Sequence, residues 1–252
     1  MRTAENYSNI SGDLTKIKIK EIVTQNFHAA QLFEKYGIDY CCNGNRPLFE
    51  VLEEKKLSPE KILTQLNELK QTTSDDSNPY GEWELDFLAQ YIVNTHHRYV
   101  KNAIPQIADH INKIVNAHGK KYSYLLEMHE VFAFIAEDLT QHMMKEEKIL
   151  FPLIKYLVET KKFNEKPKTG GYGTIKGPIN KMEQEHAAAG NATAKIRELS
   201  NGFSLPPDAC ATFRVTYQEL EEFEKDLHKH VHLENNILFP RAIELEEELL
   251  KL

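Results

Sequence analysis

The chain has 252 residues, of which 41% are hydrophobic and 27% are charged, so it is long enough to bury one or two cores. Its formal net charge of −7 argues against a nucleic acid or an anionic membrane as partner, since both bind basic surfaces. No apolar run reaches the roughly 18 residues that a transmembrane helix requires. Three cysteines do not form a disulfide framework, so we expect a reduced, cytoplasmic protein.

Residues 15–70 predict a small helical domain. Gly37 follows a helical pattern and has the position of a C-terminal cap. Ser58 directly before Pro59 is typical of a helix start, because serine caps the free N–H groups and proline fits the first helical position.

The segment 71–81 is rich in turn-forming residues and predicts a linker between two domains. We therefore place the first domain at residues 1–75 and the second at residues 76–252. From Glu82 onward the pattern predicts four long helices. The expected connections between them lie near Gly119, at residues 160–178 and at residues 200–207.

The second domain contains one motif twice. The sequence HMMKEEKILFP begins at His142 and HVHLENNILFP begins at His230, so both copies read H-x-x-x-E-x-x-I-L-F-P. On a helix, residues four apart lie on the same face. The motif therefore pairs His142 with Glu146 and His230 with Glu234. Two copies that face each other would form a metal site with two-fold pseudo-symmetry.

Alternating steps of three and four residues trace the stripe that each helix is expected to bury. The His and Glu of both motifs fall on these stripes, and His186 lies on the stripe of the third helix. Glu147 lies off its stripe, so we expect it to tolerate substitution by glutamine. His228 and His232 flank the stripe residue His230, so we expect these two side chains to face solvent. Beyond the motifs, the stripes continue through Ile149 and Leu153 and through Ile237 and Arg241.

The first helix of the second domain allows two stripes. One runs through Val93, His97 and Val100, whereas the other runs through Ile92 and His96 and becomes polar earlier. We favour His97 over His96 as the inward histidine for that reason.

The spacing of the four stripe histidines predicts a duplicated helical hairpin. His97 and His142 are 45 residues apart, and His186 and His230 are 44 residues apart. A buried carboxylate without a partner is costly, so inward glutamates beside four inward histidines indicate bound cations. Four imidazoles and two carboxylates are too many ligands for one tetrahedral zinc. Imidazole and carboxylate suit iron, manganese or zinc, and six ligands suit two such ions that share both carboxylates. For two ferrous ions an oxo or hydroxo bridge would neutralise the remaining charge. The ferritin-like pattern differs, because it uses four glutamates.

His97, the Glu185-His186 pair and the two motifs resemble a hemerythrin-like four-helix bundle. The sequence DYCCNG, which contains Cys41 and Cys42, looks like the small domain that precedes this bundle in the iron–sulfur cluster repair di-iron proteins, also called repair-of-iron-centres proteins. The resemblance covers nearly the whole chain. It implies an all-α fold, with a small helical N-terminal domain before a hemerythrin-like bundle.

The resemblance also implies a ligand set. Oxygen-carrying hemerythrins use five histidines, whereas this chain has four on its stripes, which argues against a simple oxygen carrier. By the resemblance, one iron ion is bound by His97 and His142, the other by His186 and His230, and both are bridged by Glu146 and Glu234.

The function implied is the repair of iron–sulfur clusters damaged by oxidative or nitrosative stress, with iron supplied to damaged partner proteins. One alternative is an enzyme that reduces nitric oxide or peroxide at the di-iron site. Another is a module that binds or senses oxygen or nitric oxide. The resemblance favours a thiol pair, Cys41 and Cys42, that handles iron, nitric oxide or electrons, and two ordinary thiols in a turn are the alternative. The client proteins, the electron donor and the oligomeric state, a homodimer included, stay open.

Overall fold

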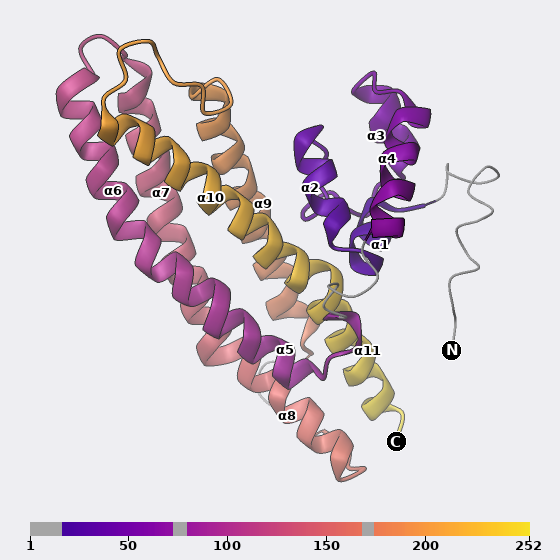
Figure 1. The fold of residues 1–252 in the computed structure, drawn as a ribbon. Coiled ribbons are helices and arrows are strands. Elements are labelled where there is room, and N and C mark those ends of the chain that lie inside the picture. The colour runs from indigo at the N-terminus through magenta and orange to yellow at the C-terminus, as the bar shows by residue number, and fades with distance from the viewer. Residues whose placement is uncertain (1–16, 73–79, 168–173) are drawn as a thin grey trace. The chain divides into compact units, whose positions relative to one another are not determined.

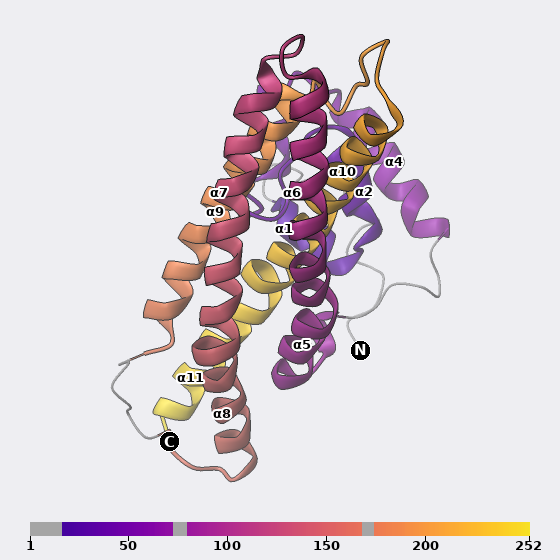
Figure 2. The ribbon, with the colours of Figure 1, turned by 90° about the vertical axis from the view of Figure 1, so that its left-hand side faces the viewer.

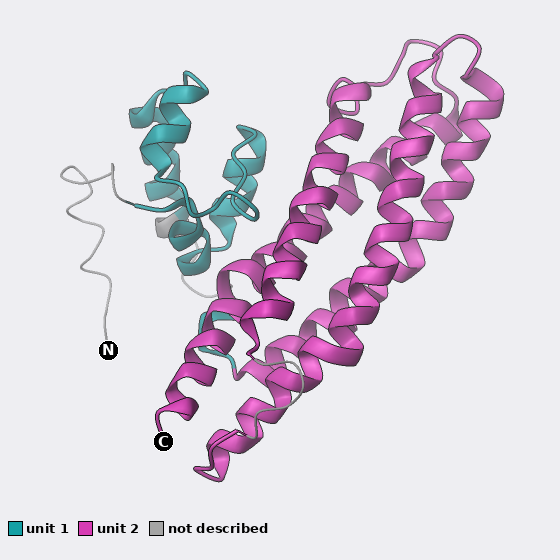
Figure 3. Ribbon diagram, turned by 180° about the vertical axis from the view of Figure 1, so that it is seen from behind, with its two compact units in different colours: residues 1–83 teal, residues 84–252 magenta. Residues whose placement is uncertain are grey.

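The computed structural model describes three stretches of the chain: residues 17–72, 80–167 and 174–252. The chain divides into two compact units, Met1–Trp83 and Glu84–Leu252, which Figure 3 colours separately. Most of the predicted linker, residues 73–79, lies outside the described residues. Over the described stretches both units consist of helices, with one isolated β-bridge between Lys18 and Pro47, so the predicted all-α fold is confirmed.

The first unit consists of short helices. Its elements are α1 (Ile19–Gln25), α2 (His28–Lys35), α3 (Leu48–Glu54), α4 (Pro59–Thr72) and the 3-10 turn η1 (Tyr80–Glu82). Gly37 caps α2 as predicted: its φ is +62°, and the next residue, Ile38, donates its backbone N–H to the carbonyl of Phe33 at 2.8 Å. Oγ of Ser58 accepts the backbone N–H of Lys61 at 3.3 Å, which confirms the predicted start of α4.

The second unit is a four-helix bundle in which three helices contain a wider, π-helical turn. Its α-helices are α5 (Leu85–Ile92), α6 (Arg98–His118), α7 (Tyr124–Lys145), α8 (Phe151–Lys162), α9 (Lys176–Leu199), α10 (Ala211–Leu233) and α11 (Phe239–Leu250). The π-helical turns are η2 (Val93–His97), η3 (Glu146–Leu150) and η4 (Glu234–Leu238).

Helices α6, α7, α9 and α10 run side by side in both views of Figures 1 and 2. Helix α7 packs against α6 and α9, and α10 packs against the same two helices, which closes the bundle. Helices α5, α8 and α11 continue α6, α7 and α10 past the π turns (Figure 1). Among the described residues, no helix is both long and apolar enough to cross a bilayer.

The π turns change which residues are buried. A π turn closes hydrogen bonds five residues apart rather than four, so the buried stripe moves by one position. From the end of η3 onward, Leu150 and Ile154 are buried, whereas Ile149 is 39% exposed and Leu153 is only partly buried. The predicted burial of Ile149 and Leu153 was therefore wrong. In the last helix, Ala242 is buried in place of the predicted Arg241 by the same shift.

The same one-residue shift occurs at η2, and it makes each of the two alternative stripes of the first helix correct over part of the helix. Before η2 ends, Ile92 and His96 are buried, as the second stripe predicts. From His97, the last residue of η2, onward, His97 and Val100 are buried, as the first stripe predicts, whereas Val93, the first residue of η2, is partly exposed. Each stripe therefore holds on one side of the π turn, and both histidines face inward.

Candidate metal centre

The four stripe histidines lie at one level of the bundle interior. His97 is the last residue of η2, His142 lies near the end of α7, and His230 lies near the end of α10. The third helix, α9, is regular around His186, so its predicted stripe is buried throughout. All four side chains are at most 1% exposed. The π turns η3 and η4 begin at the two motif glutamates, and π turns of this kind are frequent at functional sites.

Six side chains form two groups that share their carboxylates. The His97 group consists of His97, His230, Glu146 and Glu234, and the His142 group consists of His142, His186, Glu146 and Glu234. Within each group one ligand atom from every residue lies within 4.8 Å of the others. The two Nε2 atoms of the His97 group are 3.2 Å apart, and those of the His142 group are 2.9 Å apart. Each group therefore directs its imidazole nitrogens at one point.

Glu146 lies between the two groups. Its Oε2 is 3.3 Å from Nε2 of His97 and 3.2 Å from Nε2 of His142. Its Oε1 is buried and has no hydrogen-bond partner among the described residues. A fully buried carboxylate oxygen without a donor is costly unless a cation satisfies it.

Glu234 spans the two groups with separate oxygens. Its Oε1 is 3.0 Å from Nε2 of His230 and 3.9 Å from Nε2 of His97. Its Oε2 is 3.1 Å from Nε2 of His186. Like Glu146, it is completely buried and contacts a histidine of each group. Both carboxylates therefore lie between the two groups.

These distances fit metal ions. Two nitrogens bound at right angles to one ion through bonds of about 2.1 Å lie roughly 3 Å apart. The observed separations of 2.9 and 3.2 Å match that spacing. Imidazole and carboxylate together suit iron, manganese or zinc. The residues present can thus hold two cations, one for each group.

The electrostatics of the site also require positive charge. Burial disfavours the charged imidazole of His97, but Glu146 and Glu234 outweigh it and raise its pKa to about 10. Against the same burial, the two carboxylates raise the pKa of His142 to about 9. Burial lowers the pKa of His230. Burial works against ionised Glu146 and Glu234, yet the neighbouring histidines keep both pKa values below the usual range. Metal binding must therefore displace protons from His97 and His142.

Glu147 supports His97 from behind. Nδ1–H of His97 donates to Oε1 of Glu147 at 2.8 Å, and Nζ of Lys101 donates to the same oxygen at 2.6 Å. Burial works against the ionised carboxyl of Glu147, but Lys101 and His97 lower its pKa. This bond fixes the tautomer that leaves Nε2 free for a metal. Glu147, although it lies off the buried stripe, is therefore a direct neighbour of the metal-binding candidate His97.

The His142 group is supported at both histidines. Nδ1–H of His142 donates to Oε2 of Glu185 at 3.0 Å, and Lys145 donates to the other oxygen of this carboxylate. Nδ1–H of His186 donates to Oδ1 of Asn235 at 2.7 Å. Stripe analysis did not identify Asn235 or Glu147. Their positions do carry a signal, because each directly follows one of the shared glutamates.

The remaining ligand histidine lacks such support. Nδ1 of His230 is buried and has no hydrogen-bond partner among the described residues. The ring of His96 stacks on that of His230, with centroids 5.7 Å apart and planes 12° apart. Nδ1 of His96 lies 2.9 Å from Oδ1 of Asp226. His96 is thus a buried neighbour of the site and not one of its converging ligands.

Two further expectations differ from the structure. The predicted pairing of His97 with His142 and of His186 with His230 was wrong, because each group draws its histidines from different hairpins. The converging Nε2 atoms come from η2 and α10 in the His97 group and from α7 and α9 in the His142 group. His232 does not face solvent but is fully buried, and its Nδ1 accepts a hydrogen bond from Asn236 at 3.0 Å.

The first unit holds a separate thiol cluster. Cys41 is buried and Cys42 is partly exposed, and their Sγ atoms are 3.7 Å apart. Oδ1 of Asp39 accepts the backbone N–H groups of both cysteines, at 3.0 and 2.9 Å. The hydrogen bond with Cys42, burial and the charge of Asp39 raise the pKa of Cys41 well above its usual range. Cys42 is therefore the more accessible thiol of the pair, and one atom from each of the three residues could contact a single ion.

Comparisons with known proteins agree with this geometry. The family described as "Hemerythrin HHE cation binding domain" matches residues 88–242. Residues 15–70 match a domain described as being of unknown function, DUF542. The chain is 31% identical, over 90% of its length and 96% of the relative, to "Probable iron-sulfur cluster repair protein" of Haemophilus influenzae. It is 33% identical, over 85% of its length and 91% of the relative, to "Iron-sulfur cluster repair protein YtfE" of Yersinia pseudotuberculosis. The chain therefore belongs to the hemerythrin HHE family, in the same group as the proteins named iron–sulfur cluster repair proteins.

Proposed function

We propose that the chain is a di-iron protein that repairs iron–sulfur clusters damaged by oxidative or nitrosative stress, and that it does so by supplying iron. The observation that carries the proposal is the shared pair of buried carboxylates. Glu146 and Glu234 each contact one histidine of the His97 group and one of the His142 group. A site for a single ion would not need two carboxylates that each contact histidines of both groups.

The donor set favours iron with open coordination positions. Each group offers two imidazoles and two shared carboxylates, which are four protein donors for one ion. Iron accepts more donors than that, so an oxo or hydroxo bridge and a small molecule can complete the set. When bound, the ions would supply redox chemistry and, in repair, serve as the cargo. The protein's own side chains hold the imidazole protons at Nδ1 and keep the site buried.

The names of the relatives support repair as the task. A damaged iron–sulfur protein is the partner that this task requires. The thiol pair of the first unit would assist, since thiolates are soft ligands suited to iron and to iron–sulfur clusters. In this role the partly exposed Cys42 would contact the partner protein. The Sγ atom of buried Cys41 lies 3.7 Å from that of Cys42.

Metal content of the purified protein tests the di-iron centre. After anaerobic reconstitution with ferrous ion we expect two iron ions per chain, and oxidation of the loaded protein by oxygen should then give the near-ultraviolet absorption of a bridged ferric pair. His142→Ala and His186→Ala should each lose iron, because both histidines are buried ligands. His228→Ala is the matched control, since His228 lies on α10 outside both groups and should keep the metal. One tightly bound zinc and no iron would overturn the proposal.

Reactivation of a damaged iron–sulfur enzyme tests the repair function. The iron-loaded chain should restore the activity of the enzyme, with a matching loss of its own iron. The double variant Cys41→Ser, Cys42→Ser should keep the di-iron spectrum and reactivate poorly. Sustained consumption of nitric oxide with a reductant, without iron transfer, would favour a reductase instead. Full repair by the double variant would remove the thiols from the mechanism.

A further inference from the structure

The duplicated motif has different residues directly after its two shared glutamates. Glu147 follows Glu146, and Asn235 follows Glu234. Each of the two supports a histidine on the preceding helix of its own hairpin: Glu147 accepts from His97 at 2.8 Å, and Asn235 accepts from His186 at 2.7 Å. These positions are therefore equivalent in the pseudo-symmetric bundle, and both fulfil the same role.

A second pair of equivalent positions does not fulfil the same role. Glu185 directly precedes His186 and accepts from Nδ1–H of His142 at 3.0 Å. His96 directly precedes His97 and occupies the equivalent place, so its expected target is His230. It stacks on that ring instead and directs its Nδ1 at Asp226. The duplication has thus kept three of the four supporting contacts and lost the one behind His230.

The loss has an energetic consequence at one metal position. When Nε2 of a neutral imidazole binds an ion, the proton is on Nδ1 and needs an acceptor. No described residue provides an acceptor for Nδ1 of His230, so its buried N–H group would have no hydrogen bond in the metal-bound form. With the proton on Nε2 instead, His230 can donate to Oε1 of Glu234 at 3.0 Å. His230 can therefore form a hydrogen bond with its N–H group in the metal-free form but not in the metal-bound form.

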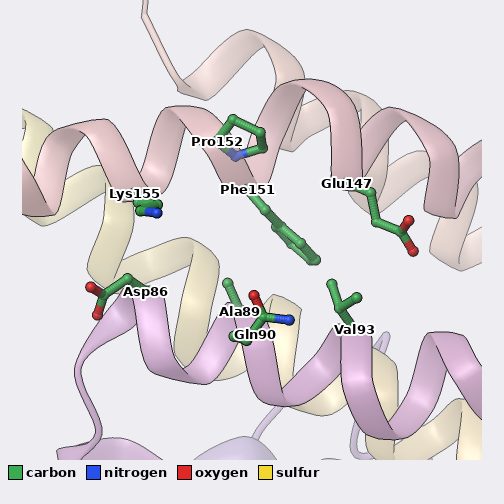
Figure 4. Close-up of a pocket in the computed structure, with 8 residues that line it drawn as sticks. All are labelled: Asp86, Ala89, Gln90, Val93, Glu147, Phe151, Pro152 and Lys155. Atoms are coloured by element: carbon green, nitrogen blue, oxygen red, sulfur yellow. The ribbon is translucent and has the colours of Figure 1, made fainter.

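The His97 group also lies beside a surface pocket. The pocket has a volume of about 480 Å³, and its lining includes Val93, Glu147 and Phe151. Figure 4 shows the ring of Phe151 projecting toward the facing helix that carries Val93. The same ring stacks on His97, with centroids 5.7 Å apart. The side chain of Glu147 is 28% exposed, whereas that of Glu185, which supports the His142 group, is 8% exposed.

We propose that the two metal positions are inequivalent, and that the position of the His97 group releases its ion first while the His142 group retains its own. The proposal rests on the di-iron function proposed above and names the ion that is donated. Two observations on the chain's own residues support it: the unsupported Nδ1 of His230 and the pocket that reaches Phe151 and Glu147 beside His97.

Chelator kinetics test the proposal without any repair assay. The anaerobically loaded ferrous protein is mixed with excess ferrozine, and the absorbance of the coloured iron complex is followed. We expect two phases of equal amplitude, with rates that differ about tenfold or more, because the loss of one supporting contact typically weakens metal affinity by at least about tenfold. Crystals depleted of half their iron should then show anomalous scattering at the His142 group only.

Variants at equivalent positions assign the phases. Asn235→Ala removes the acceptor of His186, so the slow phase should accelerate toward the fast one. Glu147→Gln weakens the acceptor of His97 and should accelerate only the fast phase. His96→Glu introduces the residue type that the equivalent position holds and should slow the fast phase. If His96→Glu does not fold, the release kinetics of Asn235→Ala and the anomalous scattering of the half-depleted crystals test the proposal instead.

The possible outcomes distinguish a failure of this inference from a failure of the proposed di-iron function. Failure to bind two iron ions would overturn the di-iron proposal itself. Two bound ions that leave in a single phase, or iron remaining at the His97 group after half depletion, would overturn only the inequivalence. An unchanged slow phase in Asn235→Ala would do the same, because the contact behind His186 would then carry no weight.

Discussion

The two halves of the bundle interior differ in what holds them together. In the apolar half, which is defined by Leu125, Phe132, Phe213 and Phe223, side chains at most 1% exposed pack on one another, and the rings of Phe132 and Phe223 meet edge to face at 5.7 Å. The site half, defined by the His97 and His142 groups, buries four imidazoles and two carboxylates at the same depth. Over the described residues all three π turns lie in the site half or directly beside it.

The comparison shows that equal burial does not mean equal stabilisation. Each aromatic ring in the apolar half contributes about 1.5–3 kcal/mol through burial alone. In the site half, burial opposes ionised Glu146 and Glu234, and positive charge must compensate. Stability should therefore depend on packing in one half, and on metal and pH in the other.

The largest effect is expected from the apolar half. Phe223→Ala removes a 1% exposed ring and should lower the free energy of unfolding by about 3–5 kcal/mol. Iron content should stay unchanged, since Phe223 lies two helical turns, about 10 Å, from His230. Urea unfolding and metal analysis measure the two quantities. Phe134→Ala, at a ring that is 50% exposed, is the control and should change stability little. Loss of iron from folded Phe223→Ala would break the distinction between the halves.

The next effect tests the π turn that borders the site. Leu150 is 1% exposed and Ile149 is 39% exposed, although a regular helix would bury Ile149. Leu150→Ala should therefore lower the free energy of unfolding by about 2–5 kcal/mol. Ile149→Ala should lower it by less than about 0.5 kcal/mol. Chemical denaturation of the two variants compares them directly, and a larger loss for Ile149→Ala would mean that the helix has no register shift.

These π turns mark the limit of what the sequence could predict. Periodicity correctly placed the four helices, the caps at Gly37 and Ser58, and the whole stripe of α9 through His186. In the other helices periodicity also assumed a regular helix, in which the stripes through His96 and His97 are alternatives. It therefore could not predict that both histidines are buried. The alternating pattern of three and four residues assumes a regular helix, so it does not indicate where a π turn interrupts the helix.

The partners of the ligands were also beyond a stripe argument. Glu147 and Asn235 lie off the buried stripe of a regular helix, and the π turns η3 and η4 contain them. Their contacts with His97 and His186 depend on which helices pack together, and that also decides the pairing of the histidines. Spacing within one helix marks the positions after the shared glutamates but does not identify the helix that supplies the histidine.

A smaller effect sharpens the role of metal in the site half. With free ferrous ion at 100 times its dissociation constant, one bound ion stabilises the folded chain by about 2.7 kcal/mol. Glu234→Gln should remove most of this difference between iron-loaded and metal-free protein, because Glu234 contacts both groups. Glu222→Gln, at an exposed position of α10, should keep it. Thermal unfolding with and without iron gives the comparison, and equal shifts in both variants would contradict a bridging role.

A pH effect of at most about 1.4 kcal/mol per pH unit and per proton is expected for the metal-free protein. His97 and His142 have folded pKa values of about 10 and about 9, against 6.5 for free histidine. Their stabilisation is complete below pH 6.5 and is lost as the pH rises toward those values. The lowered pKa of His230 acts in the opposite direction, so stability is lost as the pH falls below 6.5.

The metal-free chain should therefore be most stable near pH 6.5. Below pH 4.5 protonation of Glu146 and Glu234, whose pKa values are lowered, removes a further contribution. Iron replaces the protons on His97 and His142, so the iron-loaded protein should lose little stability between pH 7 and 9. Melting temperatures of both forms across this range test the sign. A metal-free protein whose stability stays constant or rises above pH 6.5 would show that the carboxylates do not hold protons on the two histidines, and the charge balance inferred for the site half would fail.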